Sequence, residues 1–221
     1  MSKTLNQSNL AYVDCFQVNP RFCMIKTVLF DVDGVIIHRE MYFSQRFCRE
    51  SGTPMEKVLP FFNNEFRLCL VGQADLKQEL AKYLNDWNWK KSVGDLLAFW
   101  FEHESDLDKR VLDGVCNLRN RGIRCYLATN NEKYRVQYIL GDLGLEKHFD
   151  GAISSAEAGF LKPQPEFWSA VHDFLNKPDK TEVLFWDDDT LNVVSSIDFG
   201  YHSEVFSGAD VFKSKMKSLI G

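Results

Sequence analysis

The chain has 221 residues and a formal net charge of −5, with 45% hydrophobic and 26% charged residues. This composition is typical of a folded globular protein and argues against intrinsic disorder. The mild acidity gives no reason to expect a nucleic acid or a membrane surface as partner, and no apolar run reaches the roughly eighteen residues that span a bilayer. The 6 cysteines are scattered without a Cys-x-x-Cys pair, so we expect reduced thiols in a cytoplasmic protein.

Residues 1–24 are polar and lack a clear helical or strand period, and we interpret them as a loosely ordered leader. The chain changes character at Ile25, where an apolar run over 28–30 predicts a buried parallel strand. This strand ends at Asp31, and a second carboxylate, Asp33, follows two positions later, before a glycine. Residues two apart in extended backbone point the same way, so both carboxylates are expected to face one pocket.

The stretch 38–105 reads as a series of helices with no convincing strand. Thr53 to Glu56 has the pattern of a capping box with Pro54 at the first helical position. Ser92 and Asp95 predict another helix start, which leads into a strongly aromatic segment. This part of the chain is therefore predicted to be an all-helical insertion.

After residue 105 the pattern alternates again. Apolar strands are predicted over 123–128, around 152–153, over 183–186 and over 204–206, and helical stripes lie between them. Such alternation indicates βαβ units and a mainly parallel sheet. We predict a doubly wound, Rossmann-like α/β core formed by 25–37 and 106–221, with a helical cap inserted over 38–105.

Polar side chains follow the predicted strands at the points where they end. They are Asp31 and Asp33, then Thr129, Asn130 and Asn131, then Lys162 a little beyond the third strand, and finally Asp187 and Asp188. Because the carboxyl ends of parallel strands meet at one edge, these groups are expected to converge. Taken singly, each has a plainer interpretation, in which 187–189 is a solvated helix start, Thr129 an N-cap and Lys162 a surface lysine. The four groups in this order favour a shared site instead.

The segments FDVDGV, LATNN, GFLKPQPEFW and LFWDDDTLN resemble, in this order, the four motifs of the haloacid dehalogenase-like superfamily. The resemblance is closest to its small-molecule phosphatases with a helical cap after the first motif. It implies Asp31 as nucleophile, Asp33 as general acid and base, and Lys162 as the cation that neutralises the phosphoryl group. It further implies that Thr129 and Asn130 bind phosphate. A Mg²⁺ ion would bind Asp31, the backbone carbonyl of Asp33, and one or both of Asp187 and Asp188, with Asp188 favoured as the direct ligand.

The resemblance thus predicts a Mg²⁺-dependent phosphatase that hydrolyses a small phosphorylated metabolite, such as a sugar phosphate or a nucleotide, through an aspartyl-phosphate. The protein is expected to act as a monomer or homodimer. A phosphomutase of the same superfamily remains open because it would share every core residue. A metal-independent dehalogenase would need neither Asp33 nor the Asp187/Asp188 pair, and a non-catalytic binding module is the alternative outside enzymes.

Overall fold

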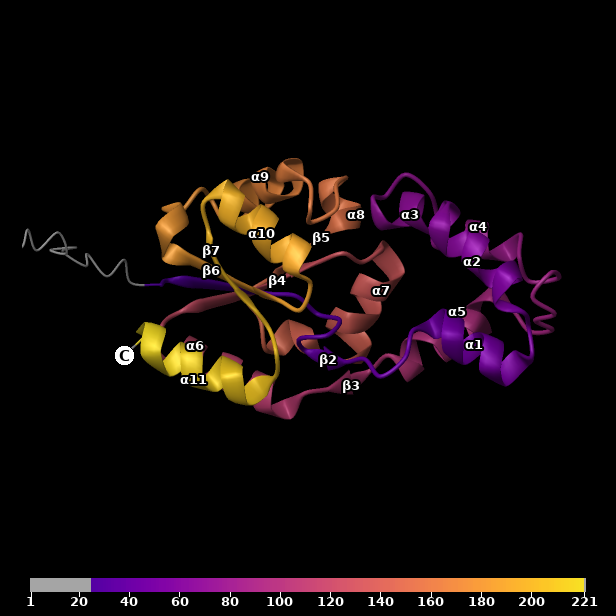
Figure 1. Ribbon diagram of the computed structural model, residues 1–221, viewed down its shortest axis with the longest axis horizontal. Helices are drawn as coiled ribbons and strands as arrows, with labels where there is room; N and C mark the ends of the chain where they lie inside the picture. The colour runs from indigo at the N-terminus through magenta and orange to yellow at the C-terminus, as the bar shows by residue number, and fades with distance from the viewer. Residues whose placement is uncertain (1–24, 221) are drawn as a thin grey trace, which may run out of the picture.

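The fold is built on a parallel sheet of five strands, seen edge-on through the middle of the computed structural model, which describes residues 25–220 (Figure 1). The predicted leader over 1–24 lies outside these residues. The strands follow the order β5-β4-β1-β6-β7. Their bounds are Thr27–Phe30 (β1), Arg124–Thr129 (β4), Ala152–Ser154 (β5), Val183–Asp187 (β6) and His202–Val205 (β7). The predicted doubly wound α/β fold is confirmed.

Strand β1 lies at the centre of the sheet, between β4 and β6, and all four of its residues are buried. Its side chains alternate between the two faces: Val28 and Phe30 join one hydrophobic core, and Leu29 joins the other. The first core is covered by α6 (Lys109–Asn120) and α11 (Ala209–Ile220). The second is covered by α9 (Pro165–Phe174) and α10 (Thr190–Phe199), on the opposite side of the sheet in Figure 1.

Short helical segments complete the core between the longer elements. They are α7 (Lys133–Gln137), the π-helical η1 (Tyr138–Asp142), the 3-10 turn η2 (Leu145–Lys147), α8 (Ser155–Ala158) and the 3-10 turn η3 (Lys180–Glu182).

Five helices form a separate helical lobe at the far end of the molecule from α11 (Figure 1). They are α1 (Phe43–Ser51), α2 (Met55–Asn63), α3 (Glu65–Leu70), α4 (Leu76–Ala81) and α5 (Val93–His103). The lobe has its own aromatic core, in which Phe43 stacks on Trp100 with ring centroids 4.5 Å apart. Two short strands, β2 (Ile37–His38) and β3 (Asp106–Leu107), pair antiparallel where the chain enters and leaves the lobe. His38 therefore lies in a strand, which the sequence did not predict.

Helices begin at both of the predicted starts in the lobe, but their ends are capped differently. The helix start predicted at Ser92 and Asp95 is confirmed, and it carries a capping box: the Ser92 hydroxyl accepts from the Asp95 amide at 3.1 Å, and Asp95 accepts from the Ser92 amide at 2.9 Å. The helix predicted at Thr53 to Glu56 is present and begins at Met55, but its capping box is wrong: Pro54 is the N-cap, and the Thr53 hydroxyl donates to the backbone carbonyl of Trp87 at 2.9 Å. A contact across the lobe satisfies this hydroxyl in place of the local helix end.

A membrane-spanning helix would need more length and more apolar character than any helix within residues 25–220 possesses.

Candidate active site

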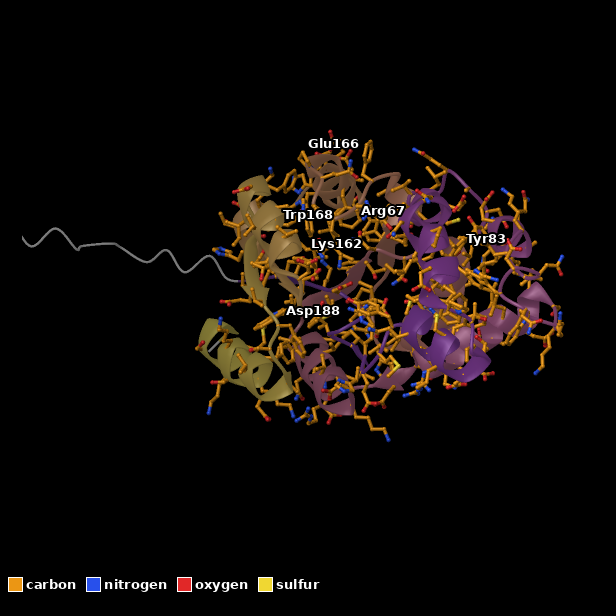
Figure 2. All side chains as sticks on the ribbon, turned by 45° about the vertical axis from the view of Figure 1, so that its right-hand side comes forward. Arg67, Tyr83, Lys162, Glu166, Trp168 and Asp188 are labelled. Atoms are coloured by element: carbon orange, nitrogen blue, oxygen red, sulfur yellow. The ribbon has the colours of Figure 1, made fainter. Side chains whose placement is uncertain are left out.

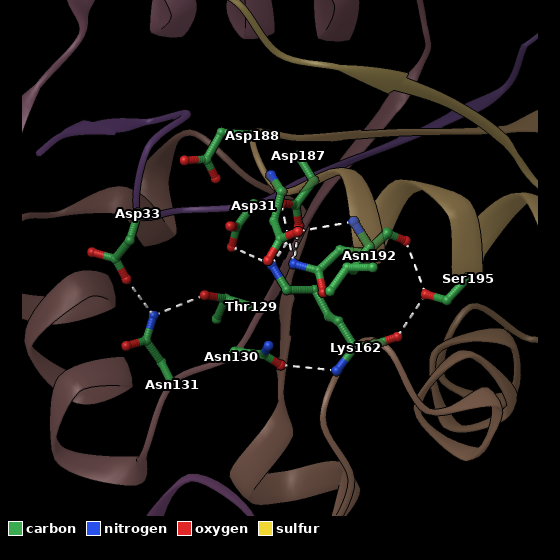
Figure 3. A network of polar contacts seen from close by, with 12 residues as sticks. Asp31, Asp33, Thr129, Asn130, Asn131, Lys162, Asp187, Asp188, Asn192 and Ser195 are labelled. Atoms are coloured by element: carbon green, nitrogen blue, oxygen red, sulfur yellow. Dashed lines mark hydrogen bonds and ion pairs between the residues drawn. The ribbon is translucent and has the colours of Figure 1, made fainter. Parts of the chain in front are cut away.

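The side chains at the ends of β1, β4 and β6 meet at one edge of the sheet (Figure 3). Asp31 directly follows β1, Thr129 is the last residue of β4, and Asp187 is the last residue of β6. The ammonium of Lys162, from the segment between α8 and α9, lies 2.7 Å from Asp31 Oδ1 and 2.6 Å from Asp187 Oδ2. The structure thus brings together groups that are far apart in the sequence.

Lys162 is buried, with 1% of its surface exposed, so the surface-lysine interpretation is wrong. Its backbone is held on both sides, because its amide donates to Asn130 Oδ1 and its carbonyl accepts from the Ser195 hydroxyl, each at 2.9 Å. A lysine loses a large part of its rotamer freedom when it is fixed in this way. The two ion pairs offset part of the cost of desolvating the charge, and loss of either partner would leave a buried charge without compensation.

The acidic triplet divides into three different environments. Asp189 is the N-cap of α10 and accepts from the Leu191 amide at 2.8 Å, so only this residue behaves as a helix start. Asp187 is fully buried, and its oxygens accept from Lys162, from the Asp189 amide at 2.7 Å and from the Asn192 side chain at 3.0 and 3.2 Å. Asp188 keeps 36% of its side chain exposed, with Arg39 as its ion-pair partner at 3.9 Å.

Three carboxylates are placed to hold a cation. Asp31, Asp187 and Asp188 each offer an oxygen, and these oxygens all lie within 4.8 Å of one another. Hard carboxylate oxygens suit Mg²⁺, which keeps several waters and takes few protein ligands. The oxygens of Asp187 are already engaged, whereas Asp188 faces outward, so the donor set fits a Mg²⁺ ion held by Asp31 and Asp188 and supported by Asp187.

Burial raises the pKa of Asp31 to about 7; the Lys162 charge opposes this rise, and the neighbouring Asp187 adds to it. The folded protein therefore binds this proton more tightly than the unfolded chain, whose ordinary value is near 3.8. The sign of the linkage follows: in the absence of a cation, stability falls as the pH rises from about 4 to about 7.

An Asp31→Asn variant is expected to melt roughly 5 °C above wild type at pH 8 in the presence of EDTA. The amide does not ionise, so it avoids the cost of a buried carboxylate beside Asp187 while still accepting from Lys162. The gain is expected to shrink at pH 4, where the wild-type carboxyl is protonated in the folded protein and its ionisation in the unfolded chain, near the ordinary value of 3.8, is incomplete. Calorimetry at the two pH values measures this difference, and a variant less stable than wild type at pH 8 would contradict the prediction.

Asp33 lies beside this cluster, and both of its oxygens are engaged. Its Oδ2 accepts from Asn131 Nδ2 at 2.8 Å, and its Oδ1 pairs with Arg135 Nη2 at 3.1 Å. The sequence placed Asn131 at a strand end without including it in the site, and it gave no indication of Arg135 or of Arg39. A helical arginine in a polar run has no spacing that distinguishes it from a solvated side chain.

Thr129 and Asn130 present polar atoms at the same edge. The Thr129 hydroxyl accepts from Asn131 Nδ2 at 2.8 Å, which leaves its own hydrogen to donate to a ligand. Thr129 is not a helix cap, because Glu132 is the N-cap of α7. Asn130 uses its carbonyl oxygen on Lys162, so its amide hydrogens can also serve as donors.

A chamber of about 170 Å³ lies between these residues and the helical lobe. Asp33, Asn130 and Asn131 line it from the core, while Phe43, Phe66 and Trp100 line it from the lobe. Figure 2 places Lys162 and Asp188 between the sheet helices and the lobe, whereas Tyr83 lies within the lobe, away from the core. Contacts outside this chamber hold the lobe to the core: Asp75 accepts from Lys133 at 2.6 Å and from the Tyr134 hydroxyl at 2.8 Å.

Comparison with known proteins places this geometry in context. The chain is 25% identical over 171 residues to a phosphorylated carbohydrates phosphatase of Thermotoga maritima, covering 74% of this chain and 76% of the relative. A haloacid dehalogenase (HAD) family enzyme of Bacteroides thetaiotaomicron, in complex with magnesium and inorganic phosphate, matches with a TM-score of 0.70 and 21% identity over 82% of this chain and 93% of the other. The L-2-haloacid dehalogenase of Xanthobacter autotrophicus matches with a TM-score of 0.59 and 19% identity over 90% and 85% of the two chains.

The two structural similarities show a shared fold. The family model of the haloacid dehalogenase-like hydrolases matches residues 25–193, which include every residue of the strand-end cluster described above. We conclude that this chain belongs to the haloacid dehalogenase-like hydrolases.

Proposed function

We propose that this protein is a Mg²⁺-dependent phosphatase that hydrolyses small phosphorylated metabolites through an aspartyl-phosphate on Asp31. The observation that carries the proposal is the ammonium of Lys162 between Asp31 and Asp187, with Asp188 close enough to share a cation with them. A phosphoryl group that enters this site meets a nucleophile and a fixed positive charge at the same point.

In the first half of the reaction, Asp31 attacks phosphorus and the bond to the leaving oxygen breaks, while Asp33 gives its proton to that oxygen. In the second half, Asp33 takes a proton from the water that attacks phosphorus, and inorganic phosphate leaves Asp31. Thr129 and Asn130 donate to phosphoryl oxygens, and Lys162 balances the negative charge. Asp31, the backbone carbonyl of Asp33, and Asp188 would hold the Mg²⁺, with Asp187 supporting them, and the ion would neutralise phosphoryl charge.

The size of the chamber and the relatives together support a small substrate. About 170 Å³ has room for roughly six water molecules, which is enough for a compact leaving group and too little for a folded protein. The Thermotoga relative is named for phosphorylated carbohydrates, which favours a sugar phosphate over a nucleotide. In this proposal, residues 38–105 form the cap that closes the chamber, and 25–37 with 106–221 form the catalytic core. The protein would act in the cytoplasm as a monomer or homodimer.

Hydrolysis of 4-nitrophenyl phosphate tests the proposal. Turnover is expected to require Mg²⁺, to disappear with EDTA, to return when Mg²⁺ is restored, and to be absent in Asp31→Asn. Activity that survives EDTA would overturn the metal assignment, and activity that survives Asp31→Asn would overturn the nucleophile. A parallel incubation with a hexose 1-phosphate separates the phosphatase, which releases inorganic phosphate, from the phosphomutase alternative, which produces an isomeric sugar phosphate.

A further inference from the structure

Arg135, on α7, connects the proposed general acid to the end of the helical lobe. Its Nη2 pairs with Asp33 Oδ1 at 3.1 Å and also donates to the backbone carbonyl of Glu104. Its Nη1 donates to the backbone carbonyl of Phe101 at 3.3 Å. One guanidinium therefore joins the loop after β1 to the C-terminal end of α5, where the chain leaves the lobe.

The position of this guanidinium is fixed from several sides. Arg135 is 3% exposed, and its Cζ lies 5.4 Å from the ring centroid of Phe101 and 5.8 Å from that of Tyr138. Its backbone amide donates at 2.6 Å to Glu132, the N-cap of α7, so the start of the helix is held as well. A guanidinium keeps its charge at any ordinary pH and is costly to bury without an anionic partner. Asp33 supplies that anion once it has given up its proton in the proposed reaction, and its Oδ1 accepts from Arg135 in either state.

These contacts restrain the position of the Asp33 carboxyl. Arg135 holds its Oδ1 and Asn131 holds its Oδ2, yet 18% of the side chain remains exposed, and the residue lines the chamber. Proton transfer requires the carboxyl to lie within hydrogen-bond reach of the leaving oxygen, and small displacements cost rate steeply.

We propose that Arg135 is a positioning residue for the general acid, which it fixes relative to the end of the lobe at Phe101 and Glu104. The inference rests on the proposed function, in which Asp33 protonates the leaving group. The guanidinium of Arg135 hydrogen-bonds to Asp33, Phe101 and Glu104, so its proposed effect on the reaction passes through Asp33.

A series of substituted phenyl phosphates tests this role, because a good leaving group such as 2,4-dinitrophenolate departs without a proton, whereas phenolate needs one. Loss of the acid therefore makes kcat/KM depend more steeply on the basicity of the leaving group. Asp33→Asn is the reference for that steep dependence. In Arg135→Met we expect phenyl phosphate to lose about 10- to 100-fold more than 2,4-dinitrophenyl phosphate. Because the comparison is a ratio within one preparation, partial misfolding cancels.

Arg135→Lys keeps the charge but cannot reach all three acceptors. The slope of its kcat/KM against the basicity of the leaving group is therefore expected to fall between those of wild type and Arg135→Met. Lys133→Met is the matched control, because Lys133 also joins α7 to the lobe, through Asp75, and is expected to keep the wild-type slope. A wild-type slope in Arg135→Met, beside a steep slope in Asp33→Asn, would overturn the inference alone. A wild-type slope in Asp33→Asn would remove the acid role of Asp33 from the proposed function.

Discussion

A Lys162→Met variant is expected to lose about a thousandfold in kcat/KM for 4-nitrophenyl phosphate. The substitution removes the buried cation that lies 2.7 Å from the proposed nucleophile, Asp31. Phosphoryl transfer spreads negative charge over the transferred group, and a fixed cation in a site closed to water contributes more to its stabilisation than a solvated one. Without Lys162, two neighbouring carboxylates also repel the incoming phosphoryl group.

The same variant is expected to melt about 10 °C below wild type in EDTA at pH 8, because loss of one partner of a buried ion pair costs about 3–5 kcal/mol. Methionine fills a similar volume, so the loss is electrostatic and leaves no large cavity. Asp31 and Asp187 then face each other without a counter-charge. Burial raises the pKa of Asp31 and Lys162 opposes that rise, so the deficit in melting temperature is expected to be larger at pH 8 than at pH 5.

Lys147→Met provides the matched control, because this lysine is exposed on the 3-10 turn η2. It is expected to change neither kcat/KM nor melting temperature appreciably. Steady-state kinetics and calorimetry at the two pH values separate the two effects of Lys162. If Lys162→Met keeps kcat/KM within tenfold of wild type, the lysine has no part in phosphoryl transfer.

The fold could be predicted because its signals are local. The apolar run at 28–30 has to be a buried strand, and the alternation after residue 105 leaves few arrangements other than a parallel sheet. The convergence of the strand ends then follows from topology alone, which is why the sequence predicts Asp31, Thr129 and Asp187 at one edge of the sheet.

Contacts made by side chains over long distances could not be predicted in the same way. Arg135 reaches Asp33 across 102 positions of the sequence, from the short helix α7, where it lies between Tyr134 and Val136. Thr53 has the local pattern of a helix cap, yet its hydroxyl donates to Trp87, 34 positions away. In both cases a polar group finds its partner only after the helices have packed, and composition or periodicity does not record that event.

A Gly34→Ala variant is expected to lose about 100-fold in kcat/KM at limiting Mg²⁺ and to need at least about tenfold more Mg²⁺ for half-maximal activity. A Cβ at this position would lie 2.2 Å from Asp188 Oδ2 and 2.5 Å from its Cγ, so the carboxylate has to move. Asp188 is the least restrained of the three acids, since its side chain is 36% exposed and its ion pair with Arg39 spans 3.9 Å. It can turn into solvent at little cost, which preserves the fold but removes the proposed metal ligand.

Gly122→Ala separates this displacement from backbone strain. Both glycines have positive φ, +97° at Gly34 and +80° at Gly122, and an alanine at either is strained by roughly 1–2 kcal/mol. No atom lies within 4 Å of a Cβ built at Gly122, which follows α6 at the edge of the sheet opposite the site. Gly122→Ala is therefore expected to lower the melting temperature by a few degrees and to leave the Mg²⁺ requirement unchanged. Titration of activity with Mg²⁺ tests whether Asp188 is a metal ligand. Equal Mg²⁺ requirements in the two variants would mean that Asp188 does not hold the ion.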